Sequence, residues 1–184
     1  FAELRGNFYG CLLDLKFQRA IVFADHLGNR PLYYCQLGDK LVFSSSVKKI
    51  KEYFDNYTDI TLKINLSGAY SMVTYAYMYD NQTLCEHIFR LNPGSYIEYR
   101  PGKFKIEKFY KLNFTERQID EDVAIEKIDQ LFLEAVKQQV QKNEEYGYLN
   151  YAPLSAGLDS RITTYALKRL GIENVINFTY SETS

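Results

Sequence analysis

Near its carboxyl end the chain carries the stretch Pro153-Leu154-Ser155-Ala156-Gly157-Leu158-Asp159-Ser160-Arg161. It follows the mostly apolar and aromatic run Tyr148 to Leu154 and precedes a helix-like run from Ile162 to Leu170, so it forms a strand-to-helix turn. Small residues let backbone N–H groups approach an anion, and the start of the following helix adds about half a positive charge. The stretch therefore predicts a phosphate-binding turn.

The sequence after this turn predicts the start of a parallel α/β sheet. We expect a helix over Arg161–Gly171, ended by Gly171, and a strand over Val175–Tyr180. The residues that we expect to face inward from the helix are Ile162, Tyr165, Ala166 and Leu170. A right-handed crossover places the carboxyl ends of both strands at one edge, together with the loop.

A long helix precedes this strand. The best domain boundary is Asn113 to Glu116. The helix begins at Asp120-Glu121-Asp122, where acidic residues favour a helix start, and it ends in the run from Lys142 to Gly147. Apolar residues recur every three or four positions at Val123, Ile125, Ile128, Leu131, Phe132, Ala135, Val136 and Val140. One face of the helix is therefore expected to be buried, and a coiled-coil zipper is a less favoured alternative because the helix is short.

The first 112 residues predict an antiparallel, strand-rich domain. Strands are expected over 7–15, 19–24, 31–36 and 41–44, with Gly38-Asp39 as a hairpin link. The helical spacing of apolar residues predicts helices over 46–54 and 65–79. The second helix has Asn65 or Ser67 as its N-cap. Further hairpins are expected at Pro93-Gly94 and at Pro101-Gly102. The fold class is thus α+β followed by α/β.

Composition excludes several classes of partner. Lys and Arg number 22 against 23 Asp and Glu, so we expect neither nucleic acid nor a membrane surface to bind. There is no signal-peptide pattern at the start and no apolar run near the roughly 20 residues that span a bilayer, which favours a cytoplasmic protein. Cys11, Cys35 and Cys85 lack metal-ligand spacing, and we interpret them as reduced filler in the core or at its edge, with a reactive thiol as the less favoured alternative.

The order Ser-small-Gly-x-Asp-Ser at Ser155–Ser160 resembles the pyrophosphate loop (PP-loop) of the N-type ATP pyrophosphatases, the group that includes asparagine synthetase and β-lactam synthetase. The segment Asp25-His26-Leu27-Gly28-Asn29-Arg30-Pro31-Leu32-Tyr33-Tyr34 resembles late strands of the class II glutamine amidotransferase domain, and Leu4-Arg5-Gly6-Asn7-Phe8 resembles the approach to the preceding strand. A Leu-x-Pro-Gly segment that ends at Tyr110-Lys111-Leu112 is also similar to the asparagine synthetase family.

The resemblance implies that residues 1–112 form the C-terminal part of an Ntn-type amidotransferase domain. It likewise implies that residues 113–184 form the N-terminal part of an ATP-binding PP-loop domain. It also implies an ATP-dependent carbon-nitrogen ligase that uses ATP and Mg²⁺, adenylates a small-molecule or peptide carboxylate, and takes ammonia from glutamine. The implied ATP and pyrophosphate residues are Pro153, Leu154, Ser155, Ala156, Gly157, Leu158, Asp159, Ser160 and Tyr180, with Asp159 as the Mg²⁺ ligand.

Catalytic residues are not assigned within the 184 residues, and we expect the stretch alone to be inactive, because Phe1 is not a nucleophile and the later site residues of the family lie beyond Ser184. The competing hypotheses are a non-catalytic interaction module that keeps the fold, and a β-lactam synthetase-like or peptide-cyclising relative. The identity of the carboxylate stays open, and so does a homo-oligomeric state.

Overall fold

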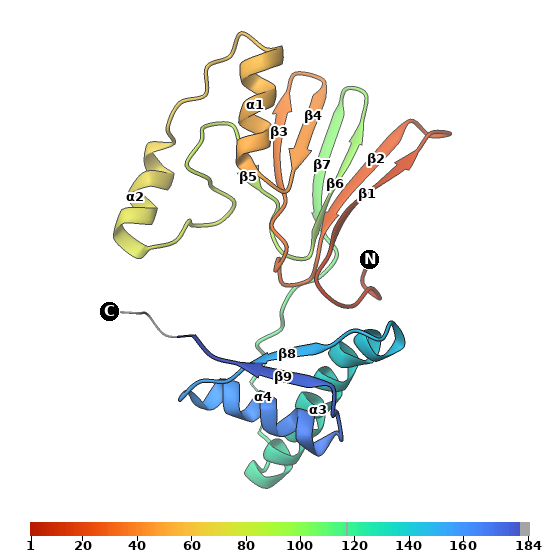
Figure 1. Ribbon diagram of the computed structural model, residues 1–184. Helices are drawn as coiled ribbons and strands as arrows, with labels where there is room; N and C mark the ends of the chain where they lie inside the picture. The colour runs from red at the N-terminus through yellow and green to blue at the C-terminus, as the bar shows by residue number, and fades with distance from the viewer. Residues whose placement is uncertain (117, 181–184) are drawn as a thin grey trace. The chain divides into compact units, whose positions relative to one another are not determined.

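The computed structural model describes residues 1–116 and 118–180. The chain divides into two compact units, Phe1–Phe114 and Thr115–Ser184 (Figure 1). The division falls within the segment in which the sequence placed a domain boundary. The functional assignment of the two segments stays a prediction.

The described residues of the first unit form antiparallel sheets, as the sequence predicted. A four-stranded sheet has the order β1-β2-β6-β7, made by Tyr9–Asp14, Arg19–Ala24, Ser95–Arg100 and Lys103–Lys108. A three-stranded sheet has the order β4-β3-β5, made by Lys40–Ser44, Tyr33–Leu37 and Phe89–Arg90. All of these pairings are antiparallel.

Two of the predicted hairpins are confirmed by the strand register. Leu37 lies opposite Lys40, so Gly38-Asp39 is the link between β3 and β4. Arg100 lies opposite Lys103, so Pro101-Gly102 links β6 and β7. Both links use a glycine at positive φ, at 52° for Gly38 and 73° for Gly102, a conformation that glycine adopts without steric cost.

The predicted hairpin at Pro93-Gly94 is wrong. β5 before it pairs with β3, and β6 after it pairs with β2 and β7, so the segment crosses from one sheet to the other. Gly94 is held by other parts of the chain: its N–H donates to the Asp25 carbonyl oxygen at 2.8 Å, and its own carbonyl accepts from the Phe109 N–H at 2.8 Å. These long-range bonds decide the path of the chain, and the Pro-Gly pair only permits it.

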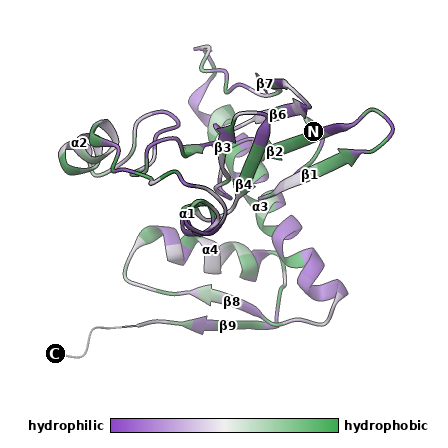
Figure 2. Cartoon of the chain, turned by 90° about the horizontal axis from the view of Figure 1, so that it is seen from above, coloured by the Kyte–Doolittle hydropathy of each residue, from purple (hydrophilic) through white to green (hydrophobic). Residues whose placement is uncertain are grey.

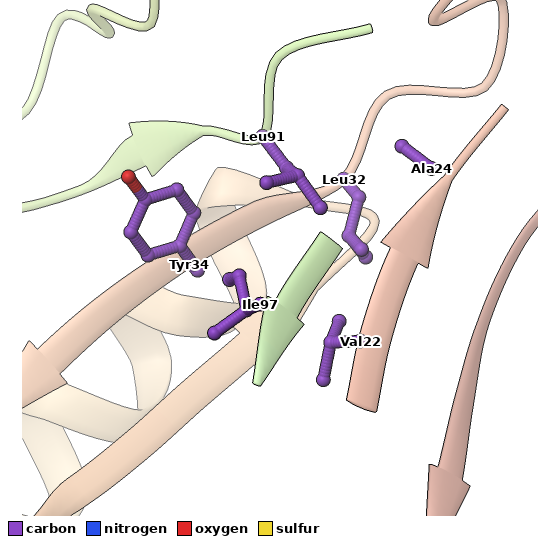
Figure 3. Close-up of a cluster of buried hydrophobic side chains, with 6 residues drawn as sticks. All are labelled: Val22, Ala24, Leu32, Tyr34, Leu91 and Ile97. Atoms are coloured by element: carbon purple, nitrogen blue, oxygen red, sulfur yellow. The ribbon is translucent and has the colours of Figure 1, made fainter. Parts of the chain in front are cut away.

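The sheets of the first unit pack face to face over an apolar core. Its buried members are Val22, Ala24, Leu32, Tyr34, Leu91 and Ile97 (Figure 3). Val22 and Ile97 come from the four-stranded sheet and Tyr34 from the three-stranded one. The alternation of apolar and polar residues along the strands therefore buries one face of each sheet.

Helices α1 (Val47–Tyr57) and α2 (Leu66–Tyr75) follow β4 in the first unit. α1 buries Ile50 and Phe54 against Cys35 and Ile88, and its lysines are exposed, as the helical spacing predicted. In α2 the N-cap is Asn65, whose side chain accepts a hydrogen bond from the Gly68 N–H. Among the described residues, no helix is both long enough and apolar enough to cross a bilayer.

The second unit contains helix α3 (Glu121–Glu145), strand β8 (Asn150–Pro153), helix α4 (Leu158–Arg169) and strand β9 (Val175–Phe178). β8 and β9 are parallel, as predicted, with Asn150 opposite Val175 and Pro153 opposite Phe178. The core of this unit consists of Val136, Val140, Ala152, Ala166 and Leu167.

Two predictions about buried helix faces need correction. In α3 the apolar residues Val123, Ile125, Ile128 and Leu131 are each more than half exposed. α4 begins at Leu158 rather than at Arg161, and its Ile162 and Tyr165 are exposed, whereas Ala166 and Leu167 are buried. The described β8–β9 pair is narrow and short, so it covers only part of each helix surface.

Candidate functional site

The predicted phosphate-binding turn joins β8 to α4. Residues 154–157 connect the two elements, and Gly157 is the N-cap residue of α4, with φ −70° and ψ 152°. Ala156 is not among the residues with positive φ, so its methyl group causes no backbone strain. The backbone of the turn is thus compatible with alanine at position 156.

Two serine side chains close the turn on itself. The hydroxyl oxygens of Ser155 and Ser160 lie 2.9 Å apart, and the Ser155 N–H donates to the Ser160 Oγ at 3.0 Å. The Gly157 N–H donates to the Ser155 Oγ at 3.2 Å. The two hydroxyl groups therefore lie within the turn and at the first turn of α4.

The helix start offers donors that no residue of the helix can use. Leu158, Asp159 and Ser160 are the first three residues of α4, and the N–H groups of a first helical turn have no intrahelical acceptor. Gly157 makes no side-chain cap, and the Ser160 hydroxyl instead bonds Ser155 and the Gly157 carbonyl oxygen. The Ser160 side chain thus closes the turn and does not cap the first N–H groups of the helix.

Asp159 is exposed in the first turn of α4. Within the described part of the chain, no hydrogen bond or ion pair engages its carboxylate; its backbone carbonyl oxygen accepts from the Thr163 hydroxyl at 3.0 Å. A single open carboxylate fits a Mg²⁺ ion that takes its other ligands from phosphate oxygens and water. Among the described residues, no group of three or more His, Cys, Asp or Glu side chains is placed to hold a metal alone.

A cavity of about 540 Å³ adjoins the turn. It is lined by Pro153, Leu154, Ser155, Gly157, Asp159, Ser160, Thr163, Phe178, Thr179 and Tyr180. The structure thus brings most of the predicted site residues together, whereas Ala156 and Leu158 do not line the cavity. Its volume lies in the range of small-molecule sites.

The lining residues that the sequence prediction missed are Thr163, Phe178 and Thr179. Thr163 lies three positions after Ser160, so helical periodicity alone could have placed it on the same face. Phe178 ends β9 directly opposite Pro153, and the Leu154 N–H donates to its carbonyl oxygen at 2.8 Å. This parallel register brings the carboxyl ends of both strands to the cavity.

The other end of this small sheet is fixed by a chain of asparagine amides. The Asn143 side chain donates to the buried Asn150 side chain at 2.8 Å, and Asn150 donates to the Asn174 side chain at 3.0 Å. Asn174 in turn donates to the Tyr148 carbonyl oxygen at 3.1 Å. These bonds tie the end of α3 to the starts of β8 and β9, and so hold the register that forms the cavity.

The first unit has its own polar cavity, of about 440 Å³, around the segment that follows β2. Its lining includes Arg5, Asn7, Asp25, His26, Asn29 and Tyr110. Asp25 is 1% exposed, and its carboxylate accepts from the backbone N–H groups of Leu27, Asn29 and Arg30 at 3.0–3.1 Å. Burial raises the pKa of Asp25, but these hydrogen bonds outweigh burial and the net shift is downward. Asp25 therefore shapes the loop that lines this cavity.

Cys11 and Cys35 of the first unit are not activated nucleophiles. Burial raises the pKa of Cys35 to about 11, and it also raises the pKa of Cys11. A raised pKa keeps a thiol protonated, and the thiolate is the reactive form. All three cysteines are free; Cys35 is buried, and Cys11 and Cys85 are half-buried, in agreement with their interpretation as filler in the core or at its edge.

Comparison with known proteins supports the part of the interpretation that concerns the first unit. The glutamine-hydrolysing asparagine synthetase 1 of Bacillus subtilis (strain 168) is 24% identical over 160 residues, which make up 86% of this chain and 24% of that protein. The chain thus spans about a quarter of the length of this relative. The sequence profile of the glutamine amidotransferase domain matches residues 1–110. Because this match covers more than half of the chain, the chain belongs to the glutamine amidotransferase domain family.

Proposed function

We propose that the second unit binds the triphosphate of ATP at the turn Ser155–Ser160, in a protein that converts a carboxylate into an amide. The observation that carries this proposal is the cavity at the carboxyl ends of β8 and β9, where Ser155, Asp159 and Ser160 meet. Ligands of open α/β sheets bind at this edge.

The groups at the turn suit the departure of pyrophosphate. The N–H groups at the start of α4, together with the Ser155 and Ser160 hydroxyls, are donors for phosphate oxygens. A Mg²⁺ ion held by Asp159 would supply positive charge beside the phosphates. Donors fixed in advance at the place where negative charge develops lower the barrier of such a step.

The proposed reaction has two steps. A carboxylate oxygen of the substrate attacks the α-phosphorus of ATP, which forms an acyl-adenylate and releases pyrophosphate. Ammonia then attacks the acyl carbon and displaces AMP, which leaves the amide. Membership of the glutamine amidotransferase domain family makes glutamine the proposed source of the ammonia. The main-chain groups of Pro153 and Tyr180, which line the cavity, are the proposed contacts of the adenine.

Calorimetric titration of the 184-residue chain with ATP in the presence of Mg²⁺ tests the nucleotide part. We expect saturable binding that Asp159→Asn weakens by about tenfold or more, because the variant loses the charge that holds Mg²⁺. Glu173→Gln is the matched control, since Glu173 is exposed and precedes β9 at the opposite end of the strand. Equal binding by Asp159→Asn and the unmodified chain would contradict the proposed role of Asp159.

The amide-forming part needs the complete protein. Pyrophosphate release is measured with ATP·Mg and a panel of carboxylates, with either glutamine or ammonium as the nitrogen source. We expect pyrophosphate to appear only when a suitable carboxylate is present. If the protein binds ATP but releases no pyrophosphate with any carboxylate, the result would instead favour a non-catalytic module that keeps the fold.

A further inference from the structure

A smaller cavity of the first unit, of about 200 Å³, lies beside strand β3. Strand β3 and the segment between α2 and β5 each supply two lining side chains, and β5 and β7 supply one each. We call this space the β3 cavity; its lining residues are Tyr34, Gln36, Asn81, His87, Phe89 and Phe104. Figures 1 and 2 both show the segment between α2 and β5 returning from α2 to the three-stranded sheet.

The returning segment is fixed by hydrogen bonds to its surroundings. Thr83 is 5% exposed, and its hydroxyl donates to the Ile88 carbonyl oxygen at 2.7 Å. The Arg90 N–H donates to the Asn81 carbonyl oxygen at 2.7 Å. His87 stands at φ 64°, in the left-handed region that favours glycine. Residues held in such a conformation cluster at ligand sites, so the position of His87 at the β3 cavity points to a binding role.

Three aromatic rings form the apolar wall of the β3 cavity. The Tyr34 ring lies 5.8 Å from that of Phe89 and 5.9 Å from that of Phe104, and the ring planes are tilted by 36° and 32°. Tyr34 is buried, whereas Phe89 is 37% exposed, so part of the wall is uncovered. Aromatic faces stack well on flat, unsaturated rings. The wall therefore favours a planar ligand.

The polar groups of the β3 cavity are hydrogen-bonding groups. In Figure 3 the Tyr34 hydroxyl points away from the other labelled side chains of the core. Burial raises the pKa of Tyr34, and the Asn81 side chain hydrogen-bonds its hydroxyl. The Gln36 Nε2 donates to the Gly38 carbonyl oxygen at 3.3 Å. Within the described part of the chain, no hydrogen bond engages the Gln36 Oε1 or the His87 ring, so both can bind a ligand.

The charge and size of the β3 cavity restrict the ligand further. None of its six lining residues is Asp, Glu, Lys or Arg, so a charged ligand would lose hydration without gaining an ion pair. The Asp80 carboxylate, which is not part of the lining, accepts from the Asn92 side chain at 2.9 Å. A cavity of about 150 Å³ can hold benzene, and sites for larger ligands begin near about 300 Å³. The β3 cavity therefore suits one neutral ring with small substituents.

We propose that the β3 cavity binds a free pyrimidine base, a single neutral heteroaromatic ring with adjacent N–H and C=O groups on its edge. The ring would stack on the aromatic wall. The amides of Gln36 and Asn81 would pair with the edge of the ring, because an amide carries a donor and an acceptor side by side. A ring without polar groups would leave these side chains unpaired. The proposal involves the first unit alone and does not depend on the nucleotide site of the second unit.

Titration of the 184-residue chain with uracil, followed by two-dimensional NMR of the backbone amides, tests the proposal. We expect saturable shifts in β3, in β5 and in residues 81–87, and weaker binding of benzene. His87→Gly should weaken uracil binding by about fivefold, because it removes one hydrogen-bonding group. This variant is expected to fold, since glycine adopts φ 64° without strain. Gln18→Gly is the matched control: Gln18 stands at φ 46°, exposed in the link between β1 and β2.

A second variant tests the aromatic wall. Phe104→Leu should weaken the binding of both uracil and benzene, because it removes one ring on which either ligand packs. The absence of saturable shifts with uracil would overturn the proposal. Benzene bound as tightly as uracil would also overturn it, because the polar groups would then select nothing. Equal uracil affinity of His87→Gly and the unmodified chain would contradict it as well.

Discussion

The hydroxyl oxygens of Ser155 and Ser160 lie 2.9 Å apart across the turn between β8 and α4. Because the Ser160 Oγ also accepts from the Ser155 N–H, the turn after β8 and the first turn of the helix are joined by two hydrogen bonds. These bonds within the chain fix the turn, and a fixed turn costs a ligand less ordering entropy than a free one.

Ser160→Ala should weaken pyrophosphate binding to the 184-residue chain by about tenfold, because a hydrogen bond to a charged group contributes about 1.5–3 kcal/mol. The measurement is calorimetric titration with pyrophosphate and Mg²⁺. Ser45→Ala, at an exposed serine of the first unit, should bind as the unmodified chain does. An unchanged affinity for Ser160→Ala would contradict the assignment of this hydroxyl to the phosphate site.

Asp25→Asn should destabilise the first unit by about 2–4 kcal/mol, because the uncharged amide satisfies fewer of the three backbone N–H groups that the buried carboxylate now accepts from. Urea unfolding followed by circular dichroism measures this change in the free energy of unfolding. Asp39→Asn is the control, since Asp39 lies exposed in the β3–β4 link.

Asp25 also predicts how the stability of the first unit depends on pH. Its folded-state pKa is lowered, so its contribution is present above the unfolded-state pKa of about 3.9 and is lost as the pH falls through the folded-state pKa. Urea midpoints measured between neutral and acidic pH should fall more steeply for the unmodified chain than for Asp25→Asn. Parallel curves would show that Asp25 has the same pKa in both states.

Val140→Ala and Val123→Ala make the same change at two positions of α3. Val140 is 6% exposed and Val123 is 52% exposed, so the first change should destabilise the second unit by about 1–3 kcal/mol and the second by about 0.5 kcal/mol or less. Thermal unfolding checks both. Equal losses would indicate that the amino-terminal half of α3 is covered in solution.

Cys35 should not react with a thiol reagent in the native chain at pH 8. Its thiol is buried and its pKa is raised to about 11. The reagent therefore cannot reach the sulfur, and little of the thiol is in the reactive thiolate form. Labelling followed by mass spectrometry of peptides measures this, with the urea-unfolded chain as the positive control. Rapid native labelling of Cys35 would mean that the β3 region opens readily.

Local sequence was enough to predict the features that depend on neighbouring residues. The links at Gly38-Asp39 and Pro101-Gly102 were predicted correctly because a two-residue turn is set by its own torsion angles. The cap at Asn65 and the start of α3 after Asp120 also depend on bonds within a few residues. The order strand, small-residue turn, helix, parallel strand was likewise readable from composition and periodicity.

Tertiary structure decided which surfaces are covered. Periodicity showed that α3 and α4 each have an apolar stripe, but Val123 and Ile162 are exposed because no described element packs on them. The path through Pro93-Gly94 was settled by bonds to Asp25 and Phe109, far away in the sequence. The sequence by itself determined the local elements and the residues of the turn, since these follow from short-range sterics and hydrogen bonds. The buried role of Asp25 and the lining by Thr163 and Phe178 depended on long-range packing, which no local pattern encodes.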